Sequence, residues 1–202
     1  MRRFEGDRLL FATGNAGKLA EMRALMAPLG ITVEGLHDHA LPEPAETEQT
    51  FVGNARIKAH AAARATGLPA LADDSGITID ALDGAPGVYT ADWAETGSGR
   101  DFAMAMRLVW EKLEAASAPF PRTAQFNATL VLAWPDGHDE VCVGRLDGQV
   151  VWPMRGAQGH GYDPIFQPDG FDTTLGEMTP EQKNTISHRA DAFRKLVKGC
   201  FS

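Results

Sequence analysis

Two adjacent carboxylates, Asp73 and Asp74, interrupt the apolar run of residues 69–80. Residues 70–72 predict a short buried strand, and residues 76–79 predict a turn followed by an alternating strand. This interpretation places both carboxylates at a strand end, where open α/β sheets bind ligands. Because successive strand side chains point to opposite faces, we expect one carboxylate to face a pocket while the other braces the turn. The alternative is an Asx turn in which both carboxylates only bond their own backbone.

Residues 9–18 contain a second candidate, an apolar strand that runs into a polar, glycine-bearing turn and then a helix. The turn offers the side chains of Thr13 and Asn15, glycine amides, a helix N-terminus and the cation of Lys18, all suited to holding phosphate oxygens. It is not a Walker loop, because Ala12 occupies the position of that motif's first glycine. An ordinary strand-to-helix turn explains the pattern about as well.

Residues 41–48 are too rich in proline and glutamate for a helix or a strand, so they predict an acidic loop. Solvated charge is the expected state of each of its carboxylates, Glu43, Glu46 and Glu48. The alternative is that one of them binds magnesium together with Asp74, because Mg²⁺ needs only one or two carboxylates besides phosphates and water.

The alanine-rich residues 50–67 predict a helix that leads directly into the strand with the paired carboxylates. Asn54 and Lys58 lie four residues apart and therefore share one face of this helix. That face either points at a ligand or is solvated. We expect His60 and Arg64 on the same helix to be solvated.

Residues 156–166 combine several glycines with an aromatic pair, which indicates a ligand cradle; an ordinary surface loop is the alternative. Further along the chain, Lys183, His188 and Arg189 gather where a short helix, started by the capping box of residues 179–182, meets the last helix. The planar guanidinium of Arg189 suits oxyanions and carbonyl groups. This junction is therefore the cationic part of the candidate site.

The elements that must position these side chains form an α/β pattern. Apolar residues at three- and four-residue spacing indicate helices, alternating apolar residues indicate strands, and residues 135–138 indicate the turn of a β-hairpin. Apart from the strand at the paired carboxylates, the predicted strands are residues 9–11, 31–36, 124–132 and 141–143, and the predicted helices are residues 19–29, 50–67 and 102–113, with two more after residues 179 and 187.

Size, charge and cysteine content restrict the classes of function. The 202 residues suffice for one sizeable domain, or for two lobes that share a sheet. A formal charge of −8 argues against a nucleic-acid surface, which needs a basic stripe. The only cysteines, Cys142 and Cys200, lack metal-site or redox spacing and predict a reducing compartment. Residues 1–7 carry charge where a signal peptide is apolar, and no apolar run is long enough for a membrane span, so we expect a cytoplasmic protein.

In this order and spacing, the polar segments resemble the inosine triphosphate pyrophosphatase family, whose members remove dITP, ITP and XTP from the nucleotide pool. The resemblance covers nearly the whole chain. It rests on residues 13–18 (TGNAGK), 50–59 (TFVGNARIKA), 72–76 (ADDSG), 84–87 (GAPG), 161–166 (GYDPIF) and 186–189 (ISHR).

The resemblance implies an α/β fold with a long mixed central β-sheet, flanked by helices that form two lobes with a substrate cleft between them. It implies one domain over residues 1–202, a homodimer, and dependence on Mg²⁺. It also implies that water attacks the α-phosphorus of non-standard purine nucleoside triphosphates, giving the nucleoside monophosphate and pyrophosphate. A small-molecule purine nucleotide is thus the expected partner, with no nucleic acid and no membrane.

Residue by residue, the resemblance implies that Asp74 is a metal-bound general base. Glu46 matches the second acidic metal position, and Glu43 competes with it for that role. His160 is a departure, because bacterial members often have phenylalanine there, and this leaves the stacking partner of the base open. The substrate-binding positions implied by the resemblance are Thr13, Gly14, Asn15, Ala16, Gly17, Lys18, Ser75, His160, Gly161, Tyr162, Asp163, Lys183, His188 and Arg189.

Three other functions fit parts of the pattern. A related pyrophosphatase acting on pyrimidine or methylated nucleotides would keep the phosphate-binding residues and differ in its base pocket. A non-catalytic nucleotide sensor would keep Lys18 and Arg189 but would have no need of Asp74. A glycosidase fits least, because its two acids face each other across the substrate, whereas Asp73 and Asp74 are expected to diverge.

Overall fold

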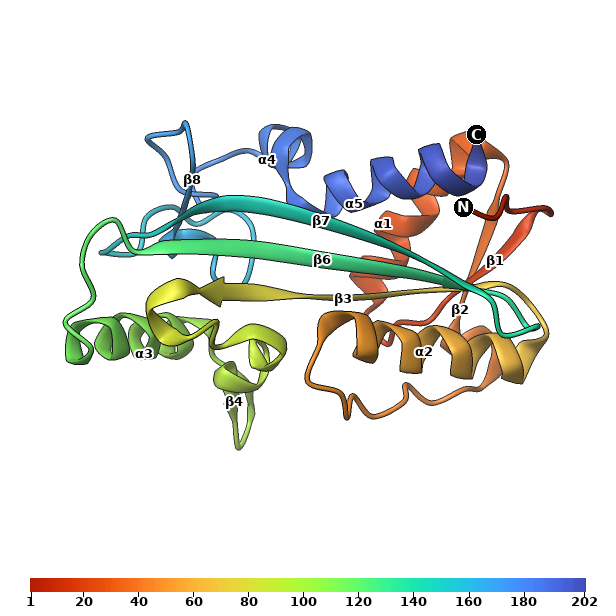
Figure 1. The fold of residues 1–202 in the computed structure, drawn as a ribbon, viewed down its shortest axis with the longest axis horizontal. Helices are drawn as coiled ribbons and strands as arrows, with labels where there is room; N and C mark the ends of the chain where they lie inside the picture. Colours follow the sequence, from red (N-terminus) through yellow and green to blue (C-terminus); the bar gives the residue numbers. More distant parts are fainter. The chain divides into compact units, whose positions relative to one another are not determined.

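A computed structural model describes residues 1–202 and contains a six-stranded sheet in the order β2-β1-β3-β6-β7-β8 (Figure 1). Strand β1 pairs in parallel with β2 and with β3, whereas β7 pairs antiparallel with β8. The predicted mixed sheet of an α/β fold is therefore confirmed. Its strands are β1 (Arg8–Phe11), β2 (Thr32–Gly35), β3 (Ala70–Ile79), β6 (Thr123–Ala133), β7 (Asp139–Val150) and β8 (Phe166–Pro168).

The helices begin and end at residues whose local chemistry favours those positions. Asn15 caps α1 through a bond from the Lys18 amide, and Thr179 forms a complete capping box with Gln182 at the start of α4. Gly67 ends α2 in the left-handed conformation, at a φ of 70°. The α-helices are α1 (Ala16–Met26), α2 (Phe51–Thr66), α3 (Phe102–Ala115), α4 (Pro180–Ile186) and α5 (His188–Leu196), and a separate small ribbon consists of β4 (Glu95–Thr96) and β5 (Gly99–Arg100).

Two compact units make up the chain. Unit 1 comprises Met1–Asp74, Ala128–Val143 and Ala192–Ser202, and unit 2 comprises Ser75–Asn127 and Gly144–Asp191. Strands β3, β6 and β7 contribute residues to both units. The expectation that residues 1–202 form one domain stays a prediction.

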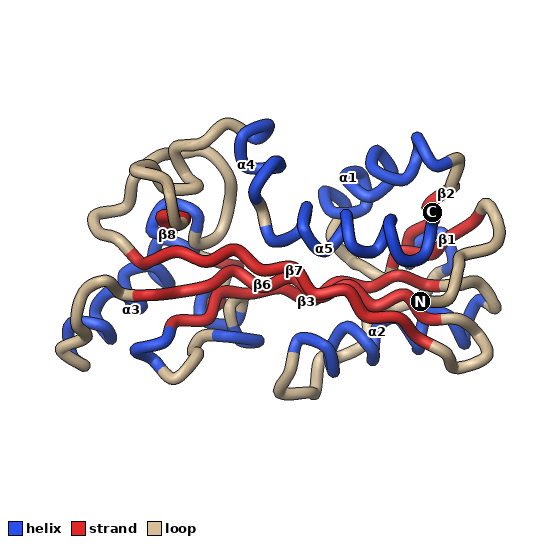
Figure 2. The backbone as a smooth tube through the Cα atoms, turned by 45° about the horizontal axis from the view of Figure 1, so that its top comes forward, coloured by secondary structure: helices blue, strands red, loops and turns tan.

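In unit 1, helices cover both faces of the sheet (Figure 2). The alanines of α2 pack against Ala70 and Ala72 of β3, while the apolar residues of α1 pack with Leu71 in a separate core cluster. This division follows from the alternation of side chains along β3. By the same alternation, Asp73 shares the α1 face with Leu71, and Asp74 shares the α2 face with Ala72.

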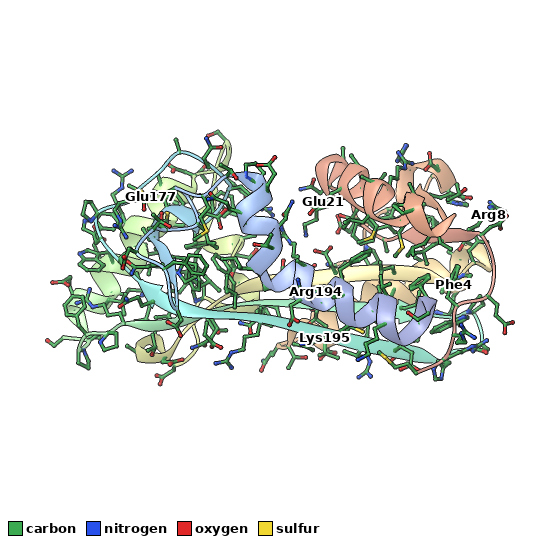
Figure 3. The ribbon with its side chains drawn as sticks, turned by 90° about the horizontal axis from the view of Figure 1, so that it is seen from above. Phe4, Arg8, Glu21, Glu177, Arg194 and Lys195 are labelled. Atoms are coloured by element: carbon green, nitrogen blue, oxygen red, sulfur yellow. The ribbon has the colours of Figure 1, made fainter.

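The end of α5 also belongs to unit 1, where it lies beside β7 with Lys195 on its surface (Figure 3). Lys195 Nζ donates a hydrogen bond of 2.8 Å to the carbonyl of Val143. At the C-terminal end of the chain, the rings of Phe4 and Phe201 lie 4.9 Å apart, and the Phe4 amide donates to the Cys200 carbonyl. These contacts fix α5 and the chain ends to the sheet.

In unit 2, the core forms where α3 meets the distal half of β3. Met106, Val109 and Leu113 of α3 are buried in one cluster with Ile77 and Ile79. Their spacing along the helix is the one that predicted its apolar face. The predicted hairpin is also present, because β6 and β7 are neighbours in the sheet joined by the short loop of residues 134–138.

The predicted turn after Asp74 is wrong. Strand β3 runs without interruption from Ala70 to Ile79, so both carboxylates lie in mid-strand. Asp-Asp-Ser-Gly is a typical turn composition, but pairing with β6 provides partners for an extended backbone. Strand β1 does end here, since its last parallel pair with β3 joins Phe11 to Leu71. The carboxylates therefore lie just beyond the end of β1 while β3 continues.

Candidate active site

The turn that follows β1 in unit 1 is held by its own side chains. Thr13 is buried, and its Oγ1 accepts a hydrogen bond of 3.1 Å from the Asn15 amide. Asn15 Oδ1 accepts a bond of 3.0 Å from the Lys18 amide and thereby caps α1. The turn thus ends at a helix N-terminus, a place that favours anions because its amides point outward.

One backbone amide of this turn donates a hydrogen bond to a carboxylate. Glu43 Oε2 accepts a hydrogen bond of 3.0 Å from the amide of Gly14. A Cβ at Gly14 would lie only 2.5 Å from the same oxygen, so the glycine permits this approach. The contact demonstrates that the turn accepts an anionic oxygen at Gly14.

One of the two adjacent aspartates pairs with the lysine of the turn. Asp73 Oδ2 lies 2.7 Å from Nζ of Lys18, so this carboxylate anchors the lysine of the turn from the α1 face of β3. Both Asp73 and Asp74 are 7% exposed. The alternation along β3 directs Asp74 toward α2 instead. The distinction between a bracing and a pocket-facing carboxylate stays a prediction.

Lys58 of α2 is a buried cation on which both adjacent aspartates of β3 act electrostatically. It is 4% exposed, and its Nζ lies 2.5 Å from Glu46 Oε1. Burial alone lowers the pKa of Lys58, but the bond to Glu46 and the negative charges of Asp73, Glu46 and Asp74 outweigh burial and raise the pKa above its usual value. The ammonium therefore stays charged.

Lys58 was not among the predicted site residues, although one signal pointed to it. Asn54 and Lys58 share a helix face, and both are buried at 2% and 4% exposure. Asn54 Oδ1 accepts a bond of 2.9 Å from the Glu48 amide and fixes the acidic loop to α2. The expectation of a solvated His60 is wrong, because its ring lies 2.9 Å from Asp139 with 18% of the side chain exposed.

The donor set near Asp74 suits a hard divalent cation that arrives with phosphates. No group of three or more histidine, cysteine, aspartate or glutamate side chains is arranged to hold a metal ion by itself. Mg²⁺ does not need such a group, because it usually binds one or two carboxylates plus substrate phosphates and water. Asp74 and Glu46, which both act on the Lys58 ammonium, supply two carboxylates. The residues present therefore fit Mg²⁺.

In unit 2, Asp163 holds the glycine-rich segment together. It is 2% exposed, and its Oδ2 accepts hydrogen bonds from the amide of His160, at 2.9 Å, and from Nζ of Lys183. Gly159 and Gly161 adopt φ values of 73° and 65°, and a Cβ at Gly159 would collide with the Asp163 carboxylate. The glycines thus allow this segment to wrap around one buried charge.

Tyr162 lies in the core of unit 2. Its side chain is 1% exposed, its ring packs edge-on against Phe102 at 5.8 Å, and its hydroxyl donates a bond of 2.8 Å to the Thr90 carbonyl. Burial raises the pKa of the Tyr162 phenol, so the hydroxyl stays protonated. Tyr162 therefore anchors the glycine-rich segment to the core of unit 2, and its buried ring offers no exposed face on which a base could stack.

Arg189 connects the start of α5 with β3 and with the glycine-rich segment. Its Nη2 donates to Ser75 Oγ at 3.3 Å, and its Nη1 lies 3.2 Å from Nε2 of His160. Its Nε is buried and has no hydrogen-bond partner. The neighbouring His188 stacks on Phe126, with ring centroids 5.0 Å apart. Fixed donor groups therefore gather at this end of unit 2.

The structure brings the predicted residues together as two groups. The unit 1 group has the features of a phosphate and metal site, and the unit 2 group offers hydrogen-bond donors. In unit 1 they are Thr13, Gly14, Asn15, Ala16, Gly17, Lys18, Glu46 and Asp74; in unit 2 they are Ser75, His160, Gly161, Tyr162, Asp163, Lys183, His188 and Arg189.

Sequence comparison reveals closely similar relatives. The dITP/XTP pyrophosphatase of Ruegeria pomeroyi is 69% identical over 200 residues, which cover 99% of this chain and 98% of that protein. The dITP/XTP pyrophosphatase of Agrobacterium fabrum is 53% identical over 211 residues, which cover 99% of each chain.

Solved structures show the same fold. A HAM1 protein from Coxiella burnetii superposes with a TM-score of 0.89 at 40% identity, covering 95% of this chain and 96% of that one. The sheet and helices described above are thus those of a known class of α/β protein. Residues 9–199 match the Ham1 family, and the chain belongs to that family. The resemblance found from the motifs is confirmed.

Proposed function

We propose that this protein hydrolyses dITP, ITP and XTP to the nucleoside monophosphate and pyrophosphate. The observation that carries the proposal is the arrangement at the end of β1, where a turn that accepts an anionic oxygen at Gly14 lies beside the buried carboxylates Asp73 and Asp74. The names of the relatives, dITP/XTP pyrophosphatase, support the same reaction.

The phosphates of the substrate bind to the turn after β1. Lys18, the turn amides and the N-terminus of α1 neutralise the distal phosphates, and Asp73 holds the Lys18 ammonium in place. A clamp on the distal phosphates makes pyrophosphate the leaving group. Neutralisation also removes the charge that would repel an approaching nucleophile.

Asp74 takes the proton from the attacking water. The ion expected from the donor set is Mg²⁺, which Asp74 and Glu46 would hold and which, when bound, neutralises developing charge on the phosphates. The buried Lys58 ammonium, on which Asp74 acts electrostatically, provides a positive charge near this carboxylate.

The donors of unit 2 bind the purine base. Arg189, Lys183 and His188 can donate hydrogen bonds, and O6 of hypoxanthine or xanthine accepts them. Adenine carries an amino group at that position, so it would place donors against donors. Sites built on such polar complementarity reject the wrong partner by roughly 10⁴–10⁵-fold.

Assembly and location belong to the same proposal. We propose a homodimer in the cytoplasm, which the family resemblance supports. None of the helices has the length and apolar character needed to cross a membrane. Light scattering during gel filtration tests the dimer, and cell fractionation tests the location.

The deciding experiment is product analysis by ³¹P NMR. One turnover of ITP is expected to give IMP and pyrophosphate without free orthophosphate, and EDTA is expected to stop the reaction. Accumulation of IDP and orthophosphate would identify an ordinary phosphohydrolase instead. A parallel panel with dCTP and dUTP tests the pyrimidine alternative, because equal rates on those substrates would contradict a purine site.

A further inference from the structure

His160 occupies a position that the surrounding backbone fixes. It lies between two glycines with left-handed φ values, and its amide donates to the buried carboxylate of Asp163. Lys183 also donates to that carboxylate, so the Asp163 charge is compensated locally. The ring of His160 therefore extends from an anchored segment.

The contact between His160 and Arg189 requires one protonation state of the imidazole. A guanidinium has only donors, so Nε2 of His160, 3.2 Å from Nη1, must be the acceptor. The imidazole is then neutral, with its proton on Nδ1. The other end of the fork donates to Ser75, so His160 and Ser75 together set the orientation of Arg189.

Protonation of His160 would reverse this contact. Nε2 would become a donor facing another donor, and two positive charges would lie about 3 Å apart, an arrangement that like charges oppose. Arg189 of α5 is a charged group in contact with this ring, and the pair of Asp163 with Lys183 of α4 lies at the His160 amide. An unperturbed imidazole titrates near neutrality, so mild acidification is the perturbation that tests this reversal.

We propose that His160 is a positioning residue for Arg189, and that it makes recognition of the purine base depend on pH. This inference rests on the proposed function. Neutral His160 holds the guanidinium fork toward the base, and protonated His160 releases it. Affinity for ITP therefore falls on acidification, while the chemical step in unit 1, which does not use His160, keeps its rate.

The test compares wild type with His160→Gln and His160→Phe between pH 5.5 and 8.5, measuring KM and kcat for ITP. Glutamine retains an acceptor that does not titrate in this range, whereas phenylalanine has no acceptor. We expect the KM of wild type to rise about tenfold on acidification and the KM of His160→Gln to stay low at every pH. The KM of His160→Phe should be about tenfold higher than that of wild type at pH 8 and should not change with pH. A tenfold change in KM is about the loss of affinity expected when one hydrogen bond to a charged group is removed.

A matched control is His37→Gln, which removes a histidine whose side chain is 73% exposed in unit 1. This variant is expected to keep the wild-type response to pH. A direct readout is the ¹⁵N spectrum of the His160 ring at pH 8, which should show the proton on Nδ1. A proton on Nε2, or the same acid response in His160→Phe as in wild type, would overturn the inference while leaving ITP hydrolysis intact. Absence of ITP hydrolysis by wild type at pH 8 would overturn the proposed function, and this inference with it.

Discussion

Replacing one carboxylate of the adjacent pair tests the division of tasks along β3. Asp74→Asn keeps the size of the side chain and removes its charge and basicity. Loss of a general base alone costs roughly 10²–10⁴-fold in kcat. Asp73 and Asp74 both act electrostatically on the buried Lys58 ammonium, so this effect is common to the two variants and the general base is what separates them. We therefore expect at least a hundredfold loss of kcat for ITP.

Asp73→Asn is the matched control, because it makes the same chemical change at the neighbouring residue. Its partner Lys18 is 29% exposed, so solvent screens the ion pair, and the asparagine oxygen can still accept from Nζ. A partly exposed pair of this kind contributes on the order of 1 kcal/mol or less, which corresponds to a change of at most about fivefold in KM. We expect kcat to stay close to wild type.

The assay is pyrophosphate release from ITP at saturating Mg²⁺, with circular dichroism to confirm that both variants are folded. The reasoning fails if Asp74→Asn retains the wild-type kcat. It also fails if Asp73→Asn loses as much kcat as Asp74→Asn, because the two faces of β3 would then not separate the tasks.

Two further predictions concern selectivity and stability. Arg189→Ala is expected to lower kcat/KM for ITP more than kcat/KM for ATP, so the preference for ITP becomes smaller. An equal decrease of kcat/KM for ITP, XTP, GTP and ATP would identify Arg189 as a phosphate ligand. Burial by itself would raise the pKa of Asp139, but the hydrogen bonds from Arg56 and His60 outweigh burial and hold this pKa below its usual range. The ionised carboxylate therefore stabilises the fold above about pH 4, and this stabilisation is lost as the pH falls further. Asp139→Asn should lower the Tm at pH 7 by about 2–4 °C, equivalent to about 1 kcal/mol, and the difference from wild type should shrink toward pH 3; a constant difference would contradict this.

The sequence predicted those parts of the fold that depend on neighbouring residues. The capping box at Thr179 and the glycine that ends α2 act within one helical turn, and both have the predicted structure. The apolar face of α3 follows in the same way from residues three and four apart. Local interactions of this kind can be read without knowing what the element packs against.

The predicted turn at Asp74 failed because distant partners determine that segment. Its composition favours a turn, but β6, some fifty residues further along the chain, pairs with β3 and keeps it extended. Lys58 was not among the predicted site residues for the same reason. Only the fold shows that the polar face of α2 points at the carboxylates of β3 and not into solvent.

The roles of Tyr162 and Asp163 likewise depend on distant contacts. The sequence indicated an aromatic, glycine-rich cradle, but Thr90 accepts the Tyr162 hydroxyl bond and Lys183 neutralises Asp163. Both side chains are therefore occupied in holding the segment.

The alternation of β3 explains why two acidic residues stand next to each other in an apolar strand. Adjacent positions direct their side chains to opposite faces, so Asp73 pairs with Lys18 of α1 while Asp74 is directed toward α2; the buried Lys58 of α2 feels the charge of both carboxylates. A shift of one residue in register would exchange the two faces and place each carboxylate against the wrong helix. The apolar residues Leu71 and Ala72, buried in different core clusters on those faces, hold the register. The packing of β3 and the placement of its carboxylates are thus consequences of the same pairing.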